Sequence, residues 1–403
     1  MRLWPLTENN PKHLLPVANK PVIERTIEAL VNADLREIIL VVQFMSERIR
    51  EKIGDGTRLG CKIRYVTQKK LGGTALALQS CREELRGDGQ FLTIYGDDYY
   101  HKDAPKKFLE KAKKISGVSV GTASAEDASR FGSLDIKKGL VTEVREKAKR
   151  HGPGQVNAGL YLMDHSIFPA IEKTQRSSRG EFELTDSLRF LIKTGEDVRA
   201  ISLNQRDWLG ISYPWDLLEA NQRALESEQA SPRLKMEDSA HVKGPVMIEQ
   251  GSVVKAGSYL EGPSRIGKEC VIGPNAYVRP YSSIGNNVKV GAGCEVKNSI
   301  VMEGVRIPHL SYVGDSIIGE GSSLGAGTIT ANLRFDETEV KSRVKRDWVN
   351  TGRKKFGAVL GDNVRTGINV SIFPGVKIGA GSWLGPGAVI DRDVATGARV
   401  KAT

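Results

Sequence analysis

Residues 242–296 read VKGPVMIEQGSVVKAGSYLEGPSRIGKECVIGPNAYVRPYSSIGNNVKVGAGCEV, and this stretch decides the fold of the second half of the chain. An aliphatic residue occupies every sixth position, without exception, at 242, 248, 254, 260, 266, 272, 278, 284, 290 and 296. A six-residue period predicts a left-handed parallel β-helix, in which each flat side of a triangular coil takes one hexapeptide. Because one coil cannot bury its aliphatic residues alone, the coils must stack and share a continuous core.

The same period resumes further along the chain. It returns at Ile318 and Leu324, and again from Leu360 to Ile390, where Thr366 is the polar exception. Many of the 43 glycines belong to this repeat, because the tight corners of a coil need positive φ angles that glycine adopts freely. We therefore expect residues 239–403 to form one β-helical domain.

Residues 1–228 follow a different pattern, in which short β-branched segments alternate with amphipathic ones. The expected strands are 37–42, 62–67, 90–95, 117–124 and 156–163, and the expected helices are 21–33, 74–85, 104–115 and 215–225. Alternation of this kind predicts an α/β domain with a Rossmann-like, mostly parallel sheet and helices on both faces. Ligands of such sheets bind beyond the carboxyl ends of the strands. The polar stretch 229–238, which contains Pro232, is expected to link the two domains.

The composition excludes several classes of protein. With 39% hydrophobic and 27% charged residues among 403, the chain is not of the disordered type. Its longest aliphatic run, Ile38–Val42, is far too short to span a bilayer, and no secretory signal opens the sequence. The four cysteines form no CxxC pair, which argues against a disulfide framework or a zinc site. We therefore expect a cytoplasmic protein that does not bind membranes.

Several motifs occur in the order that is typical of sugar-1-phosphate nucleotidylyltransferases. They are RLWPLTENNPKHLLPVANKP at 2–21, Tyr95-Gly96-Asp97, Glu146-Lys147, Asn157-Ala158-Gly159 and Gly180-Glu181. Together with the hexapeptide repeat, they make the whole chain resemble the bifunctional GlmU-type enzymes of archaea. The resemblance implies N-acetylation of glucosamine-1-phosphate (or galactosamine-1-phosphate) by acetyl-CoA, then transfer of a uridylyl group from UTP, or of a nucleotidyl group from dTTP. It also implies Mg²⁺ and a homotrimer.

Nucleotidyl transfer accumulates negative charge along the triphosphate, so cations and Mg²⁺ must be positioned there in advance. Asp97 directly follows the expected strand 90–95, where an oxygen ligand for Mg²⁺ belongs. The resemblance assigns the remaining roles as follows: Arg2 and Lys12 contact phosphates, Gln68, Gly73 and Thr74 contact the nucleobase, and Glu146, Lys147, Asn157 and Gly159 contact the sugar phosphate.

Two departures put nucleotidyl transfer in question. The family opens with a strand and a glycine-rich L-x-x-G-x-G-x-R loop, whereas this sequence starts with Met1-Arg2, inside that signature. We expect the natural start to lie upstream. The family's W-x-D-x-G motif reads Trp208-Leu209-Gly210 here, so Gly210 replaces a metal-binding aspartate, and Asp216 is expected to open the helix 215–225 instead. An alternative is therefore an acetyltransferase with a degenerate nucleotidyltransferase domain.

The second half carries residues suited to acetyl transfer. An amine that attacks a thioester must lose a proton, and histidine is the natural base near neutral pH. His309 lies where the six-residue counting is interrupted, in a segment that resembles the family's acetyltransferase centre, whereas His241 is expected to be structural. The resemblance places Arg279, Lys297, Tyr312 and Asn332 around the sugar phosphate and Ala326 at acetyl-CoA, and Lys341 of the basic insertion 334–355 is expected to be a further substrate contact. A second alternative, a nucleotidylyltransferase with a non-catalytic β-helix, would need neither His309 nor Asn332.

The insertion 334–355 interrupts the coils and carries eight Lys or Arg against four Asp or Glu. Three interpretations remain open: recruitment of anionic ligands, contact with a neighbouring subunit, or a solvated charged loop. Nucleic-acid binding is not expected, because few aromatic residues accompany these charges and no known nucleic-acid motif occurs.

Overall fold

The computed structural model describes residues 2–68, 72–85, 87, 89–113, 117–146, 152–228 and 236–402. Lys147 and most of the expected linker 229–238 lie outside these ranges. The chain divides into two compact units, Met1–Pro21 with Ile211–Thr403, and Val22–Gly210. The sequence places the domain boundaries at 228 and 239, where the repeat pattern changes. The contacts within the structure instead group residues 1–21 and 211–228 in the same unit as the coils. Among the described helices, none is long and apolar enough to cross a membrane.

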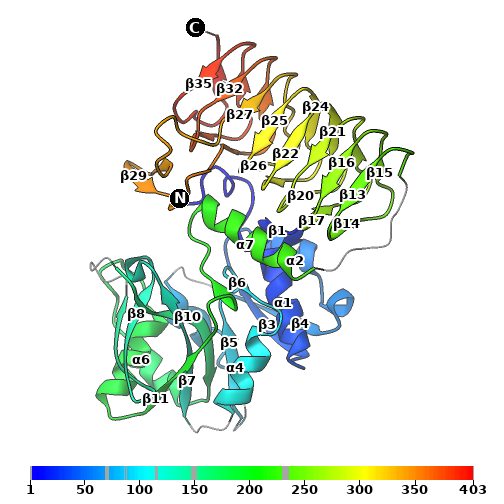
Figure 1. Ribbon diagram of the computed structural model, residues 1–403. Coiled ribbons are helices and arrows are strands. Elements are labelled where there is room, and N and C mark those ends of the chain that lie inside the picture. The colour runs from blue at the N-terminus through cyan, green and yellow to red at the C-terminus, as the bar shows by residue number, and fades with distance from the viewer. Residues whose placement is uncertain are drawn as a thin grey trace. The chain divides into compact units, whose positions relative to one another are not determined.

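The C-terminal unit contains a parallel β-helix with three flat faces, which confirms the fold expected from the repeat (Figure 1). Sheet I contains β13 (His241–Lys243), β16 (Tyr259–Glu261), β19 (Tyr277–Val278), β22 (Glu295–Lys297), β25 (Tyr312–Gly314), β27 (Ile329–Thr330), β32 (Ser371–Ile372) and β35 (Val389–Ile390). Sheet II contains β14 (Val246–Ile248), β17 (Ser264–Ile266), β20 (Ser283–Ile284), β23 (Ile300–Val301), β26 (Ile317–Ile318), β30 (Val359–Leu360) and β33 (Lys377–Ile378).

Sheet III forms the third face. It contains β15 (Val253–Val254), β18 (Val271–Ile272), β21 (Lys289–Ala292) and β24 (Arg306–His309), then Ser323, which forms one bridge to β24 and one to β31, then β31 (Arg365–Thr366), β34 (Trp383–Leu384) and β36 (Arg399–Val400). Pairing between successive coils is parallel throughout the three sheets, and the aliphatic residues of the repeat line one continuous core. Each inward side chain thus lies on the equivalent side chain of the next coil.

Two corners in the middle of the β-helix each lack one residue. Val254 pairs with Ile272 and Ile272 with Val290, eighteen residues apart, but Val290 pairs with Ile307 and Val301 with Ile318, seventeen apart. The missing residues are absorbed at corners where Asn298 and Asp315 adopt positive φ angles of 45° and 50°. The interruption seen in the sequence is therefore a pair of tightened corners, and the buried core continues through them.

The insertion 334–355 contains a hairpin of β28 (Lys341–Val344) and β29 (Asp347–Asn350). Val340 and Ser342 are buried, and the Ser342 hydroxyl donates to the Gly375 carbonyl at 2.8 Å. The insertion is thus anchored on the coils by buried residues, while Phe335 and Trp348 are exposed. Of the three interpretations, a wholly solvated loop fits these contacts least.

The N-terminal segment packs within the same unit as the coils. It contains a 3-10 turn (Lys12–Leu14), β1 (Pro16–Val17) and β2 (Lys20–Pro21), and it contacts α7 (Pro214–Glu226). Asn221 of α7 accepts hydrogen bonds from the Ala18 amide and the Ser283 hydroxyl, at 2.8 and 2.6 Å. Asp216 accepts from the amides of Ser212 and Tyr213 at 2.8 Å, so it opens α7 as expected from the sequence.

The Val22–Gly210 unit is an α/β domain. In chain order it contains α1 (Val22–Asn32), β3 (Glu37–Val42), α2 (Ser46–Ile53), a 3-10 turn (Thr57–Leu59), β4 (Lys62–Thr67), α3 (Thr74–Gln79), β5 (Phe91–Ile94), β6 (Tyr99–Tyr100), α4 (Ala104–Ala112), β7 (Val118–Ala125), a 3-10 turn (Ala128–Arg130), β8 (Gly132–Lys137), β9 (Leu140–Glu146), β10 (Gly154–Met163), α5 (Ile167–Lys173), α6 (Leu184–Lys193), β11 (Val198–Ser202) and β12 (Trp208–Leu209). The expected strands and helices are thus present, with α3 ending earlier than expected.

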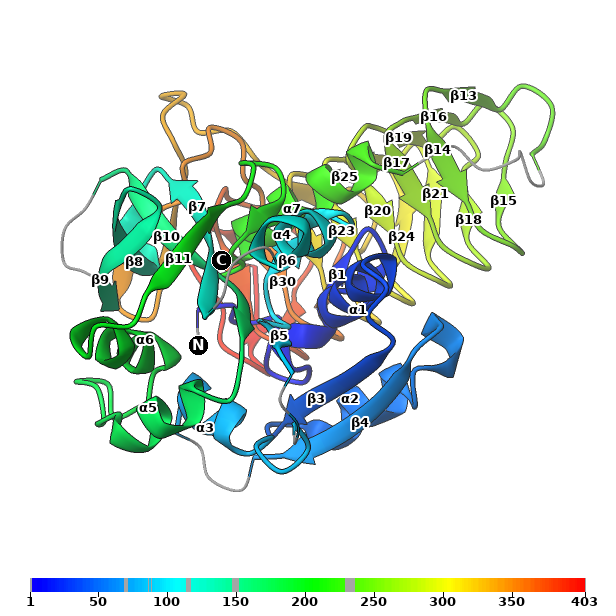
Figure 2. The ribbon, with the colours of Figure 1, turned by 90° about the horizontal axis from the view of Figure 1, so that it is seen from below.

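Strand pairing in this unit is mixed. β3 and β4 form a parallel pair (Figure 2), and β7 and β11 are also parallel. β10 instead runs antiparallel to both β5 and β7, because the β8–β9 hairpin lies between β7 and β10 in the chain. Both faces of β10 are covered: Val156, Ala158, Leu160 and Leu162 pack with α4, and Tyr161 and Met163 pack with α5 and α6.

Candidate active sites

One corner of the β-helix, between sheet I and sheet II, gathers polar residues from successive coils. Arg279 follows β19, Lys297 ends β22, Asp315 follows β25 and Asn332 follows β27. Because these strands stack in parallel, their ends fall in neighbouring columns along the coil axis, with Arg279 opposite Lys297 and Asp315 opposite Asn332. Three of the predicted sugar-phosphate residues, together with Asp315, therefore belong to a single corner, although 53 positions separate the first from the last.

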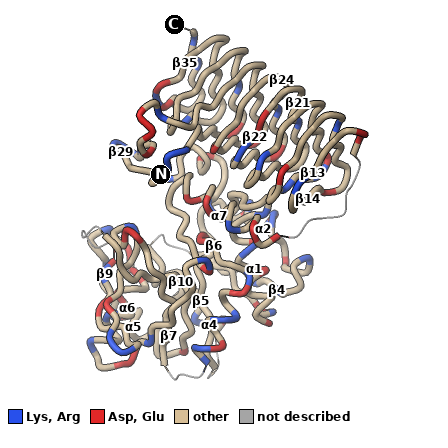
Figure 3. The backbone as a smooth tube through the Cα atoms, in the orientation of Figure 1, with Lys and Arg blue, Asp and Glu red and all other residues tan. Residues whose placement is uncertain are grey.

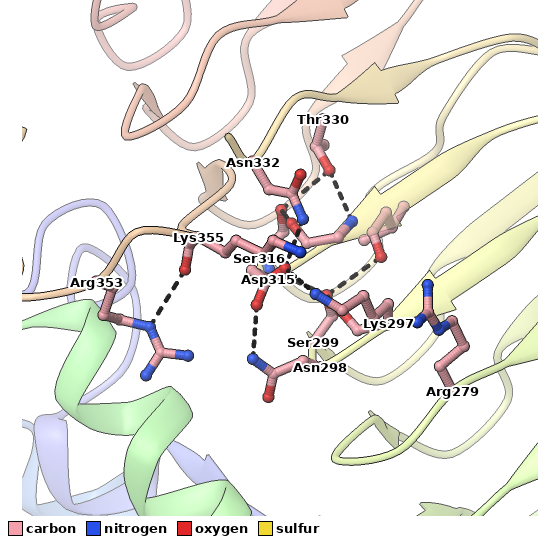
Figure 4. A network of polar contacts seen from close by, with 12 residues as sticks. Arg279, Lys297, Asn298, Ser299, Asp315, Ser316, Thr330, Asn332, Arg353 and Lys355 are labelled. Carbon is pink, nitrogen blue, oxygen red and sulfur yellow. Dashed lines mark hydrogen bonds and ion pairs between the residues drawn. The ribbon is translucent and has the colours of Figure 1, made fainter. Parts of the chain in front are cut away.

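Asp315 is the centre of this corner (Figure 4). It is 2% exposed, and its carboxylate accepts hydrogen bonds from Lys297 Nζ at 2.9 Å, Asn298 Nδ2 at 2.7 Å and Asn332 Nδ2 at 2.5 Å. The Asn332 amide also donates to the Tyr312 hydroxyl at 3.1 Å. Burial, together with the Asp315 charge, raises the pKa of Tyr312, so its hydroxyl keeps its proton and can donate it to a ligand.

Sequence reasoning missed Asp315 and Asn298. The sequence does contain a signal for them, because both residues lie where the spacing between aliphatic residues drops from six to five. A break in the spacing, however, is also what the end of a repeat looks like. Asn298 Oδ1 and Arg279 Nε are buried atoms that find no hydrogen-bond partner among the described residues. A terminal N–H of Arg279 donates a hydrogen bond to Glu295 Oε1 at 2.9 Å, and that bond raises the pKa of the guanidinium. The corner thus offers unsatisfied polar atoms to a polar ligand.

His309 lies at the next corner, between sheet III and sheet I. It ends β24 opposite Ala292 of β21, and its side chain is exposed. The Gly327 amide donates to the His309 carbonyl at 3.2 Å, so Ala326 lies one coil further along this corner. The structure therefore brings the predicted base and the predicted acetyl-CoA contact into adjacent coils. Lys341 lies outside both corners, exposed at the start of β28.

The predicted nucleotide residues of the α/β unit, Gln68, Gly73 and Thr74, lie close together, after the end of β4 and at the start of α3. Gln68 Nε2 donates to the Gly73 carbonyl at 3.4 Å, and Thr74 Oγ1 accepts from the Leu184 amide at 2.9 Å. Gly73 has a φ of 96°, and a Cβ there would approach the Phe182 carbonyl oxygen to 2.5 Å. Glycine is therefore required where the loop enters α3.

The predicted sugar-phosphate residues of this unit form a second group. Asn157 Oδ1 accepts from the Gly159 amide at 2.9 Å, and a Cβ at Gly159 would meet the Tyr95 ring at 2.4 Å. Glu146 accepts from Thr185 at 3.2 Å and pairs with Arg179, which also contacts the buried Glu183. Burial raises the pKa of Glu183. Lys147 lies outside the described residues.

Asp97 lies just beyond β5, as expected, in the turn that precedes β6. The adjacent Asp98 accepts a hydrogen bond from the Trp208 indole at 3.2 Å. At Gly210 a Cβ would approach the Phe131 ring to 2.4 Å, so the space that an aspartate would need is filled by an aromatic side chain. Arg2 and Lys12 belong to the unit that contains the coils, where the Arg2 guanidinium lies 5.8 Å from the Tyr213 ring centre.

Comparisons with known proteins agree with both halves. The Nucleotidyl transferase family matches residues 1–227, the GMPPB C-terminal domain matches 260–373, and the hexapeptide repeat of succinyl-transferase matches 357–392. A solved Bacillus anthracis structure, assigned as a glucose-1-phosphate thymidylyltransferase, is 28% identical with a TM-score of 0.51, and the match covers 58% of this chain and 93% of that chain.

Two relatives match almost from end to end. "Bifunctional protein GlmU" of Methanocaldococcus jannaschii is 42% identical over 98% of this chain and 93% of the relative. "Bifunctional sugar-1-phosphate nucleotidylyltransferase/acetyltransferase" of Sulfurisphaera tokodaii is 40% identical over 98% of this chain and 96% of the relative. The α/β unit followed by a hexapeptide β-helix has the same domain composition, and the chain therefore belongs to the family of bifunctional GlmU-type nucleotidylyltransferase/acetyltransferases.

Proposed function

We propose that this chain N-acetylates an amino-sugar-1-phosphate with acetyl-CoA and then couples the product to UTP, giving UDP-N-acetylglucosamine. The proposed nucleotidyltransferase module is 1–228 and the proposed acetyltransferase module is 239–403, joined by the linker 229–238. The Asp315 network carries the first activity, because it orients Lys297 and Asn332 beside an unpaired buried Asn298 oxygen. A β-helix used only for assembly needs no such arrangement of charges.

In the proposed acetyl transfer, Lys297 and Arg279 bind the sugar's phosphate, and Tyr312 and Asn332 orient the sugar ring. The amine attacks the thioester carbonyl, its proton passes to His309, and the C–S bond breaks to release the CoA thiolate. The exposed imidazole of His309 is open to a substrate proton, and Ala326 in the adjacent coil would lie along the acetyl-CoA arm. Lys341 would act as a further phosphate contact at the edge of the site.

In the proposed uridylyl transfer, a sugar-phosphate oxygen attacks the α-phosphorus of UTP and pyrophosphate leaves. Arg2 and Lys12 would neutralise the triphosphate, Gln68, Gly73 and Thr74 would contact the base, and Glu146, Lys147, Asn157 and Gly159 would bind the sugar. The donors present fit Mg²⁺ carried by the nucleotide, since Mg²⁺ is usually held by one or two carboxylates plus substrate phosphates, and Asp97 supplies one. Within the described ranges, no cluster of three ligating side chains occurs.

We also propose a cytoplasmic homotrimer. UTP and acetyl-CoA, the proposed substrates, are cytoplasmic metabolites. Ile329 of β27 and Val389 of β35 are exposed apolar residues on the outer side of sheet I. A neighbouring copy of the coils would cover them.

The test measures CoA release with glucosamine-1-phosphate, and pyrophosphate release with UTP and N-acetylglucosamine-1-phosphate, on wild type and His309→Ala. Loss of CoA release alone in the variant supports both activities. Acetyl transfer without pyrophosphate release would favour the acetyltransferase-only alternative. That alternative is supported by the Phe131 ring, which fills the space that an aspartate at position 210 would need. Failure of wild type to acetylate either amino-sugar phosphate would overturn the proposal for the β-helix.

A further inference from the structure

The segment 2–21 runs along the edge of sheet II at which the strands of that sheet end. Asn19 Nδ2 donates to the Ile284 carbonyl at the end of β20, at 2.6 Å, and Asn9 Nδ2 donates to Asp362 Oδ2, just beyond β30, at 3.3 Å. β30 is the third strand after β20 in sheet II, so these two contacts are roughly 14 Å apart along the coils. In Figure 3 the tube beside the N-terminal mark lies against the coils. A segment whose proposed role belongs to uridylyl transfer is thus fastened to the β-helix.

Glu8 joins this segment to the C-terminal end of the coils. Its Oε2 accepts a hydrogen bond from the Ala380 amide at 2.9 Å, and its Oε1 accepts from the Thr396 hydroxyl and, at 2.7 Å, from the Trp4 indole. The Gly397 amide donates to the Ala380 carbonyl at 2.8 Å, so Thr396 lies one coil beyond Ala380. A single carboxylate therefore holds one aromatic side chain of the segment and two successive coils.

The same contacts fix the turn that follows Arg2. The Leu6 amide donates to the Leu3 carbonyl at 2.9 Å, and both of these leucines are buried. The Trp4 ring centre, on the same turn, lies 5.2 Å from the ammonium of Lys377, a residue of β33 that is 3% exposed. Arg2 itself is exposed. The turn thus offers an exposed guanidinium on a base that the coils hold in place.

We propose that Glu8 is a positioning residue for uridylyl transfer, which holds Arg2 at the UTP triphosphate by joining its turn to the last coils. A cation that is placed in advance stabilises developing negative charge without reorganisation during the reaction. An arginine on an unanchored turn would have to be ordered at each binding event, at a cost in conformational entropy. This inference rests on the proposed uridylyl transfer and adds Glu8 and Thr396 to the residues that support it. The last coils then serve both proposed activities.

The first test is Glu8→Gln. Glutamine keeps the size of the side chain but has one accepting oxygen, so either the Ala380 amide or the Trp4 indole and Thr396 hydroxyl lose their acceptor. We expect kcat/KM for UTP to fall about 100-fold, the effect of misplacing a reacting contact by about 1 Å, with KM for N-acetylglucosamine-1-phosphate and CoA release unchanged. If Glu8 acts through Arg2, the double variant with Arg2→Ala should be no less active than Arg2→Ala alone. Additive losses, or a wild-type kcat/KM in Glu8→Gln, would overturn the proposal.

The second test changes only the coils. Thr396→Val removes the hydroxyl that Glu8 accepts from and should lower kcat/KM for UTP about tenfold, as expected for one hydrogen bond to a charged group. Thr396→Ser keeps the hydroxyl and should behave as wild type. The matched control is Ser382→Ala, which removes a buried hydroxyl that donates to the Ala395 carbonyl at 2.8 Å within the same coils. If this control lowers pyrophosphate release as much as Thr396→Val, coil stability explains the loss and the proposal is wrong.

Calorimetric titrations with UTP and UMP separate this inference from the proposed function, because the two ligands differ only in the β- and γ-phosphates. If wild type binds UTP and Glu8→Gln binds it at least tenfold more weakly, with the affinity for UMP unchanged, Glu8 positions a phosphate contact even where no pyrophosphate release is detected. If the variant loses affinity for both ligands equally, or for neither, the inference is wrong whether or not wild type turns over UTP. Failure of wild type to bind UTP would overturn the inference and the proposed uridylyl transfer together.

Discussion

Asp315→Asn removes one buried negative charge and leaves the size of the side chain unchanged. Asparagine tolerates the positive φ of 50° at this corner, so the backbone need not move. In the wild type the carboxylate accepts three hydrogen bonds, one of them from the Lys297 ammonium, whose side chain is 18% exposed. The variant leaves that ammonium facing an amide that has only one accepting oxygen.

Breaking a fully buried ion pair by removing one partner costs about 3–5 kcal/mol, and the partial exposure of Lys297 lowers this to about 2 kcal/mol. We therefore expect chemical denaturation to show that loss in the free energy of unfolding of the β-helix. Acetyl transfer should suffer more, because Lys297 and Asn332 share one carboxylate oxygen of Asp315 as acceptor, and a neutral amide oxygen holds the ammonium and the amide less firmly. We expect kcat/KM for the amino-sugar phosphate to fall roughly 100-fold, with pyrophosphate release unchanged.

The matched control is Asp393→Asn. Lys377 and Asp393 form another buried Lys–Asp pair on the coils, with Nζ and Oδ2 3.7 Å apart, and neither belongs to the proposed site. This variant should lose stability and retain acetyl transfer. If Asp315→Asn loses no more CoA-release activity than Asp393→Asn, the idea that Asp315 positions the sugar-phosphate residues is wrong.

Three further predictions concern the other groups. His309→Ala should lower CoA release by at least 100-fold and leave pyrophosphate release intact; unchanged CoA release would show that another group takes the proton. Gly210→Asp alone should destabilise the α/β unit, because its Cβ meets the Phe131 ring, whereas Gly210→Asp combined with Phe131→Ala should raise pyrophosphate release; thermal unfolding and the pyrophosphate assay check both. Burial raises the pKa of Glu183 above 4.5, so as pH rises the unfolded chain releases this proton at a lower pH than the folded chain does. The free energy of unfolding should therefore fall as pH rises from 4.5 through the folded-state pKa. Urea titrations of Glu183→Gln should lack this fall, and a pH profile identical to that of wild type would contradict the prediction.

Much of the α/β unit could be predicted from sequence. The strands 37–42 and 62–67 match β3 and β4 residue for residue, because each is a short β-branched run between turn residues. The antiparallel placement of β10 could not be predicted, because strand direction depends on which neighbours the chain returns to, and the β8–β9 hairpin decides that at long range. The sequence also could not predict that the Phe131 ring fills the space beside Gly210, since the two residues are 79 positions apart.

The sequence by itself determined the β-helix, its stacking and the candidate residues His309, Lys297 and Asn332. A six-residue period leaves no choice of which face is buried, since every coil must place its aliphatic residue on that of the coil before. Only the tertiary structure decided what the lost positions at Asn298 and Asp315 mean. In a one-dimensional reading they end the repeat, whereas in the folded coils each is a tightened corner. The shortened corner buries the Asp315 carboxylate among polar residues from three coils. These residues are neighbours because the coils stack, although they are far apart in the sequence.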